Sequence, residues 1–124
     1  MKICRTASGK GLDSEVDPRF GRCSYFVIYD PDTGYVESVS NASVAASGGA
    51  GIKAAETIAN TGVNVLLTGN VGPNAFSIFS EVGIEVRVGV KGTVREAVRQ
   101  YEAGELEPIS SPNSAPHSGL KKGS

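Results

Sequence analysis

Residues 63–68, VNVLLT, form a nearly continuous apolar run of strand length, and this run constrains the fold more than any other feature of the sequence. Segments with apolar side chains at helical spacing lie on both sides of it, at residues 52–60 and 73–82. A strand that is apolar on both faces is typical of a parallel sheet covered by helices. The sequence therefore predicts an α/β protein.

Four further strands are predicted, at residues 2–7, 24–30, 35–40 and 84–90. The turn PDTG at 31–34 favours an antiparallel hairpin between two of them. A third helix is predicted after Thr93, which fits a capping box with Glu96. Because crossover connections are right-handed, the simplest arrangement is a three-layer α/β/α fold whose five-stranded mixed sheet has the order 3-2-1-4-5, numbered along the chain.

The length and the local composition indicate a single domain followed by a tail. A chain of 124 residues can form one hydrophobic core and is too short for two ordinary domains. From residue 110 the sequence SSPNSAPHSGLKKGS is rich in Pro, Ser and Gly and cannot bury enough apolar surface to order itself. We therefore expect a domain at residues 1–107 and a flexible tail at 108–124.

The charge balance excludes partners that are recruited by a large net charge. Twelve Lys and Arg residues against thirteen Asp and Glu residues give a formal charge of −1, which would not draw the chain to nucleic acid or to an anionic membrane. No apolar stretch approaches the roughly 18 residues of a membrane helix, and the polar N-terminus does not resemble a signal peptide. We expect a cytoplasmic protein, monomeric or weakly dimeric.

Glycine-rich segments are predicted to meet at one edge of the sheet. Ligands of such sheets bind beyond the carboxyl ends of the parallel strands, where the loops at 8–23, 69–73 and 89–93 and the first helix start at 47–51 should lie. Helix N-termini expose N–H groups, and glycine lets a ligand approach the backbone. The candidate anion-binding positions are Gly48, Gly49, Gly51, Gly69, Asn70 and Gly72. Alternatively, the glycines only permit tight turns and close helix packing.

The loop DPRFGRC at 17–23 contains the most concentrated chemistry in the sequence. Arg19 and Arg22 flank Phe20 and Gly21, and two guanidiniums held by a constrained backbone could bind one anionic ligand. The alternative for the arginines is surface salt bridges with nearby carboxylates. Phe20, included as a candidate contact, is more typical of a core residue. The nearby carboxylates are Asp13, Glu15 and Asp17.

Cys23 is the candidate metal ligand. It follows Arg22 at the junction between loop and strand, where positive neighbours would lower its pKa and favour the thiolate that binds metal. The alternative is an inert, half-buried thiol. Cys4, in the first predicted strand, is expected to be buried.

Other classes of site fit the sequence poorly. There is no GxGxxG fingerprint, and Gly9-Lys10-Gly11 lacks the spacing of a phosphate-binding P-loop. A metal-dependent nuclease would need acidic residues inside the strands, and the strands at 2–7 and 63–68 have none. The one histidine, His117, lies in the tail, so no catalytic residue is assigned.

Three segments, taken together, resemble the dinitrogenase iron–molybdenum cofactor biosynthesis family of NifX-like and NifB C-terminal-domain-like small proteins. They are SEVDPRFGRCSYF at 14–26, the glycine-rich stretch at 47–86 and GTVREAVRQYEAGEL at 92–106. The resemblance implies a ribonuclease H-like motif without nuclease activity. It also implies binding or transfer of iron–sulfur or molybdenum–iron–sulfur cofactor precursors, and a molybdenum–copper–sulfide protein is another relative.

These features lead to a functional expectation. A sulfide-rich cluster is a compact polyanion that arginines, backbone N–H groups and one thiolate could hold transiently. We expect a non-enzymatic metallocluster carrier whose partners are cluster donor and acceptor proteins. Two alternatives stay open: an enzyme directed to phosphate or nucleotides through the glycine loops, and a non-catalytic interaction module.

Overall fold

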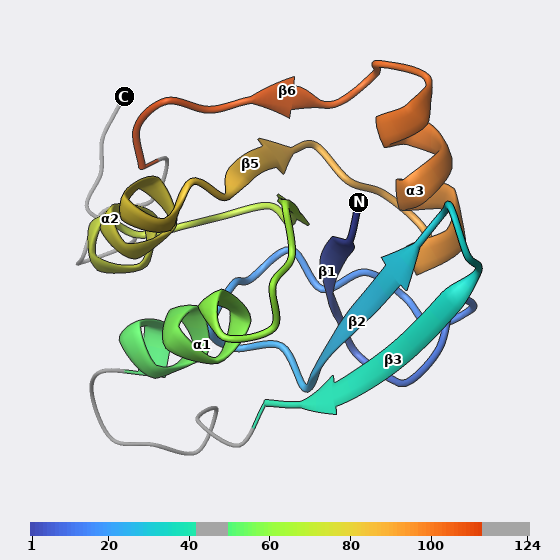
Figure 1. Ribbon diagram of the computed structural model, residues 1–124, viewed down its shortest axis with the longest axis horizontal. Helices are drawn as coiled ribbons and strands as arrows, with labels where there is room; N and C mark the ends of the chain where they lie inside the picture. The colour runs from blue at the N-terminus through green and yellow to red at the C-terminus, as the bar shows by residue number, and fades with distance from the viewer. Residues whose placement is uncertain (42–49, 113–124) are drawn as a thin grey trace.

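The computed structural model describes residues 1–41 and 50–112, and in this part of the chain three helices and six strands form one α/β unit (Figure 1). The helices are α1 (Ala50–Ala59), α2 (Pro73–Val82) and α3 (Val94–Glu102). The strands are β1 (Ile3–Ala7), β2 (Tyr25–Asp30), β3 (Tyr35–Ser40), β4 (Val65–Leu67), β5 (Glu85–Val88) and β6 (Glu107–Pro108). None of these helices is long and apolar enough to cross a membrane.

The strands form a single mixed sheet in the order β3-β2-β1-β4-β5-β6. The β1–β4 and β4–β5 pairs are parallel, and the pairs at the two outer parts of the sheet are antiparallel. The order predicted for the first five strands is confirmed. The observed sheet has a sixth strand that the sequence analysis did not predict.

Strand β6 was missed because two residues, one of them proline, leave no detectable pattern in the sequence. Proline is tolerated at a sheet edge, where its missing N–H breaks no ladder, and Pro108 pairs with Arg87 there. The next residue, Ile109, donates its backbone N–H to the Val86 carbonyl at 3.1 Å and packs against the core. Ordered contacts thus extend past residue 107, and the expected boundary between domain and tail stays a prediction.

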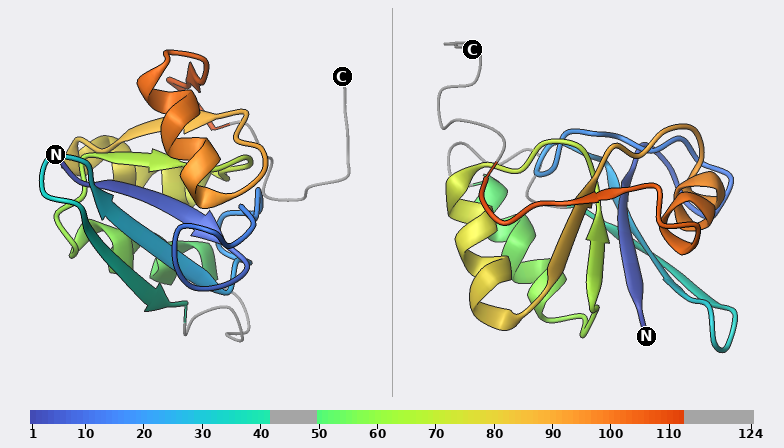
Figure 2. Two further views of the ribbon diagram at one scale, coloured as in Figure 1. Left: turned by 90° about the vertical axis from the view of Figure 1, so that its right-hand side faces the viewer. Right: turned by 90° about the horizontal axis from the view of Figure 1, so that it is seen from above.

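Helices cover both faces of the sheet, as predicted. Figure 2 shows α1 and α2 together on one side and α3 on the other. The larger core lies under α1 and α2, where Phe26, Leu66 and Phe79 are fully buried. The smaller core lies under α3, where Ile3 and Ala97 pack together.

The predicted helix ends agree with the structure, whereas parts of the apolar stripes do not. Helix α2 ends at Gly83, whose φ of 79° suits only glycine well, and Thr93 and Glu96 form the expected capping box. However, Ile52 and Val82 are exposed at 37% and 53%. Helical spacing overestimates the buried stripe because α1 and α2 each bury a narrow face of small residues and one or two large ones.

Candidate functional site

The loops after β1 and β4 lie side by side, as predicted for the carboxyl ends of neighbouring parallel strands. The Pro18 carbonyl accepts hydrogen bonds from the backbone N–H groups of Gly69 at 3.1 Å and Asn70 at 2.7 Å. In return, the Phe20 N–H donates to the Asn70 carbonyl at 3.2 Å. Residues 17–23 and 69–72 therefore form one connected platform.

Gly69 is required by this close approach. A Cβ at position 69 would lie 2.5 Å from the Pro18 Cβ and 2.7 Å from the Pro18 carbonyl oxygen, distances that real side chains do not reach. The backbone N–H groups of Gly69 and Asn70 are also used by Pro18. In this conformation they stabilise the platform, as in the alternative interpretation of the glycines, and do not form an open anion cradle.

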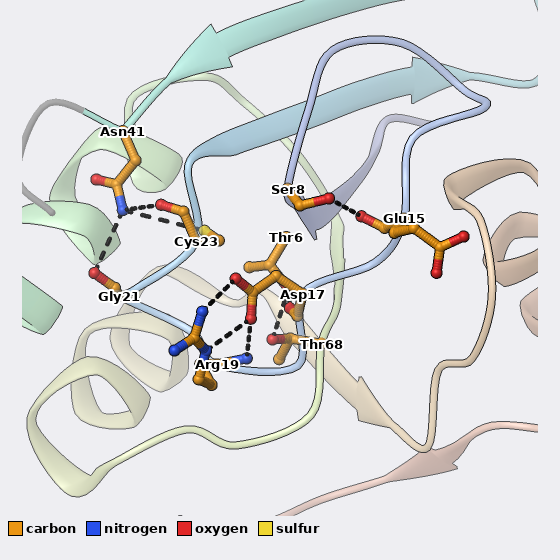
Figure 3. Close-up of polar contacts among 9 residues, drawn as sticks. All are labelled: Thr6, Ser8, Glu15, Asp17, Arg19, Gly21, Cys23, Asn41 and Thr68. Carbon is orange, nitrogen blue, oxygen red and sulfur yellow. Dashed lines mark hydrogen bonds and ion pairs between the residues drawn. The ribbon is translucent and has the colours of Figure 1, made fainter.

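Asp17 and Arg19 form a bidentate ion pair on the platform (Figure 3). Arg19 donates from Nε to Oδ1 at 3.1 Å and from Nη2 to Oδ2 at 3.0 Å, and its backbone N–H also donates to Oδ1. These hydrogen bonds hold the pKa of the Asp17 carboxyl below its usual value, although burial acts in the opposite direction. For Arg19, the salt-bridge alternative is thus realised, with 64% of its side chain still exposed.

The buried Thr6 holds the backbone of Asp17 in place, and the buried Thr68 supports Thr6. The Asp17 N–H donates to the Thr6 carbonyl at 2.9 Å, and the Thr6 hydroxyl donates to the Asp17 carbonyl. Thr68 Oγ1 lies 2.9 Å from Thr6 Oγ1 and acts as the donor, since the Thr6 proton is already used. Thr6 and Thr68 occupy corresponding positions at the ends of β1 and β4, and the sequence analysis assigned a role to neither.

Arg22 is the exposed cation of the platform. Gly21, with φ of 92°, turns the chain between the two arginines, and the Arg22 N–H donates to the Arg19 carbonyl at 3.1 Å. Within residues 1–41 and 50–112, the Arg22 guanidinium has no hydrogen bond or ion pair. Among the described residues, the platform therefore presents one paired and one unpaired guanidinium on the same turn.

Asn41 is a supporting residue that the sequence analysis missed. Its buried amide donates from Nδ2 to the Cys23 carbonyl at 2.9 Å and to the Gly21 carbonyl at 3.3 Å (Figure 3). It thereby ties the end of the β2–β3 hairpin to the arginine turn. A polar residue directly after a strand gives only a weak sequence signal, because asparagine is common at such positions.

The predicted low pKa of Cys23 is wrong. Cys23 is 0% exposed and belongs to the larger core. Burial raises the pKa of the Cys23 thiol to about 12, and the Asp17 charge raises it further, whereas the expected Arg22 effect does not appear. The sequence placed Cys23 beside an arginine, but the side chain points inward while Arg22 points to solvent. Cys4 is buried as expected, and burial raises its pKa as well.

Phe20 belongs to the core more than to the open surface. Its ring lies 5.2 Å from that of Phe79 in an edge-to-face arrangement and 6.0 Å from that of Phe26. It anchors the arginine turn on α2 and β2. The core interpretation of Phe20 therefore describes its position better than a direct ligand contact.

Two further candidate glycines, Gly51 and Gly72, lie at helix starts. Gly51 is in the first turn of α1, and a Cβ on Gly21 would lie 3.4 Å from its Cα, so the arginine turn packs on this helix end. Gly72 is the N-cap of α2 and is followed by Pro73, and no side chain caps the helix. Gly48 and Gly49 lie outside the described residues, as does His117.

No group of three or more His, Cys, Asp or Glu side chains in residues 1–41 and 50–112 is arranged to hold a metal ion. The described site is instead a cationic platform. Arg19 and Arg22 provide charge, the Asp17 and Asn41 hydrogen bonds fix the backbone between them, and Gly51 and Gly72 mark two helix N-termini nearby. Such an arrangement favours a compact anion.

Comparison with known proteins identifies relatives across most of the chain. Residues 1–104 match the family described as dinitrogenase iron-molybdenum cofactor. The apo form of the orange protein from Desulfovibrio gigas is 47% identical, covers 91% of this chain and 96% of its own, and superposes with a TM-score of 0.87. A NifB-like protein from Thermotoga is 37% identical over 89% of this chain and 94% of its own, with a TM-score of 0.79. An uncharacterised protein of Methanocaldococcus jannaschii is 33% identical over 77% of this chain and 83% of its own.

Proposed function

The chain belongs to the dinitrogenase iron-molybdenum cofactor family, and on this basis we propose that it is a non-enzymatic carrier of a sulfide-rich metallocluster. Family membership supports a role in cofactor biosynthesis. The proposed cargo is an iron–sulfur, molybdenum–iron–sulfur or molybdenum–copper–sulfide cluster or a precursor of one. The observation that carries the proposal is the pair of exposed guanidiniums, Arg19 and Arg22, on one rigid turn.

The platform matches the chemistry of such a cargo. A sulfide-bridged cluster carries negative charge on its outer sulfurs, and guanidinium groups and backbone N–H groups donate hydrogen bonds to them. Arg22 is available without rearrangement. Arg19 has a carboxylate partner, so a cluster competes with Asp17 for its donors. This competition limits the affinity, which suits a carrier that must give up its cargo.

Cys23 is proposed only as a secondary ligand. Its thiol is buried and its pKa is raised, so the arginine turn has to move before the sulfur can reach a metal. Capture by charge would come first, and any bond to the thiolate would follow. Because a carrier receives and delivers its cargo, its partners are a cluster donor and a cluster acceptor protein, and we place all three in the cytoplasm.

Cluster uptake can be measured directly. The purified full chain is incubated without oxygen with tetrathiomolybdate alone, with tetrathiomolybdate and copper(I), or with ferrous iron and sulfide, and is then separated by gel filtration. If the protein is a carrier, sulfide-to-metal charge-transfer absorption should elute with it in at least one mixture. An excess of a thiol chelator should then remove the cluster, and this absorption should disappear from the protein fraction. A colourless protein fraction from all three mixtures would contradict the proposal.

A further inference from the structure

A second arginine site lies on the opposite face of the sheet, under α3. Arg5, in β1, has the same orientation as Ile3, which packs with Ala97 of α3, and it is 0% exposed. Its Nη1 donates to the Ile3 carbonyl at 2.9 Å and to the Val27 carbonyl at 3.3 Å. Its Nε and Nη2 are buried without a hydrogen-bond partner in the described part of the chain. Buried polar groups are nearly always paired with protein, water or a ligand, so a partner is expected at these two nitrogens.

The two unused nitrogens form the side of the guanidinium that binds oxyanions. Nε and Nη2 present two parallel N–H groups, which fit the two oxygens of a carboxylate or phosphate. Arg19 in the same chain uses these two atoms to hold the Asp17 carboxylate. Although burial lowers the pKa of Arg5 to about 10, its guanidinium stays charged at neutral pH. A charged fork of this kind is costly to bury unless an anion occupies it.

A pocket of about 190 Å³ lies against α3, and Arg5 is not among the residues that line it. One face of α3 lines the pocket with residues 95, 98, 99 and 102, whose spacing places them on the same side of the helix. The other lining residues are Leu12 and Tyr29. Two of its lining residues also act on Arg5: the Tyr29 ring centroid is 5.9 Å from the Arg5 guanidinium carbon, and the Glu102 charge favours the charged form of Arg5. Tyr29 and Glu102 therefore connect the pocket to the Arg5 guanidinium, which is buried behind them.

The charges around the pocket favour an anion. Arg95 and Arg99 lie one helical turn apart on its wall, and Glu102 is the one acidic residue that lines it. Arg95 pairs with Asp13 at 3.1 Å, whereas the Arg99 side chain has no ion-pair partner among the described residues. The pocket is smaller than the roughly 300–1,000 Å³ of sites for drug-sized ligands, which limits the ligand to a few atoms.

We propose that this pocket binds a small oxyanion of the carboxylate or phosphate class, with Arg5 as its buried cation and Arg99 as a cation on its wall. The site is separate from the Arg19–Arg22 platform, because the sheet lies between α3 and the helices α1 and α2. It does not depend on cluster binding.

Titration of the full chain tests the site. Inorganic phosphate or acetate is added at constant ionic strength while amide nitrogen–proton spectra are recorded. We expect saturable shifts at Tyr29, Val98 and Glu102 with at least one anion. Arg5→Met should remove them, and Arg99→Gln should weaken binding by about tenfold, as expected for one charge-assisted contact. Lys53→Gln, which removes an exposed charge from α1, is the matched control and should bind like the parent protein.

The opposite results are equally clear. No saturable shift with either anion, or equal shifts in the Arg5→Met and parent proteins, would overturn the proposal. Binding that appears only after Glu102→Gln would do the same, because Glu102 would then be the resident partner of Arg5. If Arg5→Met does not fold, the Arg99→Gln variant still tests the assignment. An anion affinity of Arg99→Gln equal to that of the Lys53→Gln control would contradict it.

Discussion

Both carboxylate oxygens of Asp17 accept hydrogen bonds from the guanidinium of Arg19: Oδ1 lies 3.1 Å from Nε, and Oδ2 lies 3.0 Å from Nη2. The carboxylate is 9% exposed while the Arg19 side chain is 64% exposed, so the acid is part of the scaffold and the base faces solvent. Asp17 thereby fixes the direction of Arg19 and at the same time competes with any anion that approaches it. The strength of this one ion pair should influence both the stability of the loop and the exchange of a ligand.

Asp17→Asn should lower the free energy of unfolding at pH 7 by about 1–2 kcal/mol, since three hydrogen bonds to a buried carboxylate lose their charge. The pKa of Asp17 is lowered in the folded state, so this contribution is complete above the unfolded pKa of roughly 4 and disappears as the pH falls through the folded pKa. Urea unfolding of both proteins across pH 2–7 should show the difference vanish at the acid end. Asp13→Asn is the control. It breaks the ion pair between Asp13 and Arg95, and because the Asp13 side chain is 85% exposed, the change should have little effect on stability.

Cluster uptake should depend on the two arginines of the platform. Arg19→Gln and Arg22→Gln should each weaken retention by about tenfold, as expected for a charge-assisted contact, and the double variant should retain no coloured species. Arg22→Gln should have the larger effect, because Arg22 needs no release from a carboxylate. The measurement is absorption that elutes with the protein after gel filtration, with Lys53→Gln as the charge-matched control. Native thermal stability together with unchanged uptake in the double variant would refute the platform as the binding site.

Two candidate glycines should respond differently to alanine. Gly69→Ala places a Cβ 2.5 Å from the Pro18 Cβ and should destabilise the fold by about 1–3 kcal/mol, as overpacking does. Gly51→Ala meets no atom within 4 Å and lies in the first turn of α1, so stability should be unchanged or slightly higher. Thermal unfolding of the two variants side by side makes the comparison. Equal melting temperatures would mean that the Pro18 contact is not rigid in solution.

The sequence predicted the sheet order well because each of the first five strands has its own pattern. The apolar run before Thr68, the hairpin turn at 31–34 and the capping box at Thr93 are local signals, and each was found at its expected place. Strand β6 was not predictable, since its two residues are held in place by β5 and not by a pattern of their own.

The site was predicted at the level of loops but not of side chains. Topology alone brings residues 17–23 and 69–72 together at the ends of β1 and β4. Which side chains turn inward depends on tertiary packing: Cys23 joins the core, while Arg22 next to it faces solvent. The hydrogen bonds from Asn41 to this turn connect residues about twenty positions apart, a distance at which a single sequence carries no signal.

Two truncations should show which C-terminal residues contribute to the stability of the domain. Removal of residues 110–124 should leave the melting temperature within a few degrees, because this composition cannot sustain a core. Removal of 107–124 should lower it clearly, since it deletes β6 and the Ile109 contacts with Val86 and the core. Calorimetry of the two truncated proteins provides the test. A shorter deletion that already prevents folding would show that the tail contributes to the domain.

Stability should fall at alkaline pH because two thiols are buried in the protonated form. Burial raises the pKa of Cys23 from 9.0 to about 12, and that of Cys4 is raised in the same direction. A raised folded pKa stabilises the folded state fully below the unfolded value, and this stability is lost as the pH rises toward the folded value. Between pH 9 and 10 the free energy of unfolding should therefore decrease, by up to about 1.4 kcal/mol per pH unit for each thiol. Cys23→Ala should reduce this slope in urea unfolding and leave the Cys4 contribution.

Iodoacetamide at pH 8 should modify both thiols far more slowly in the folded protein than in urea. Rapid modification of Cys23 alone would show instead that the arginine turn opens readily and presents the thiol to a cluster.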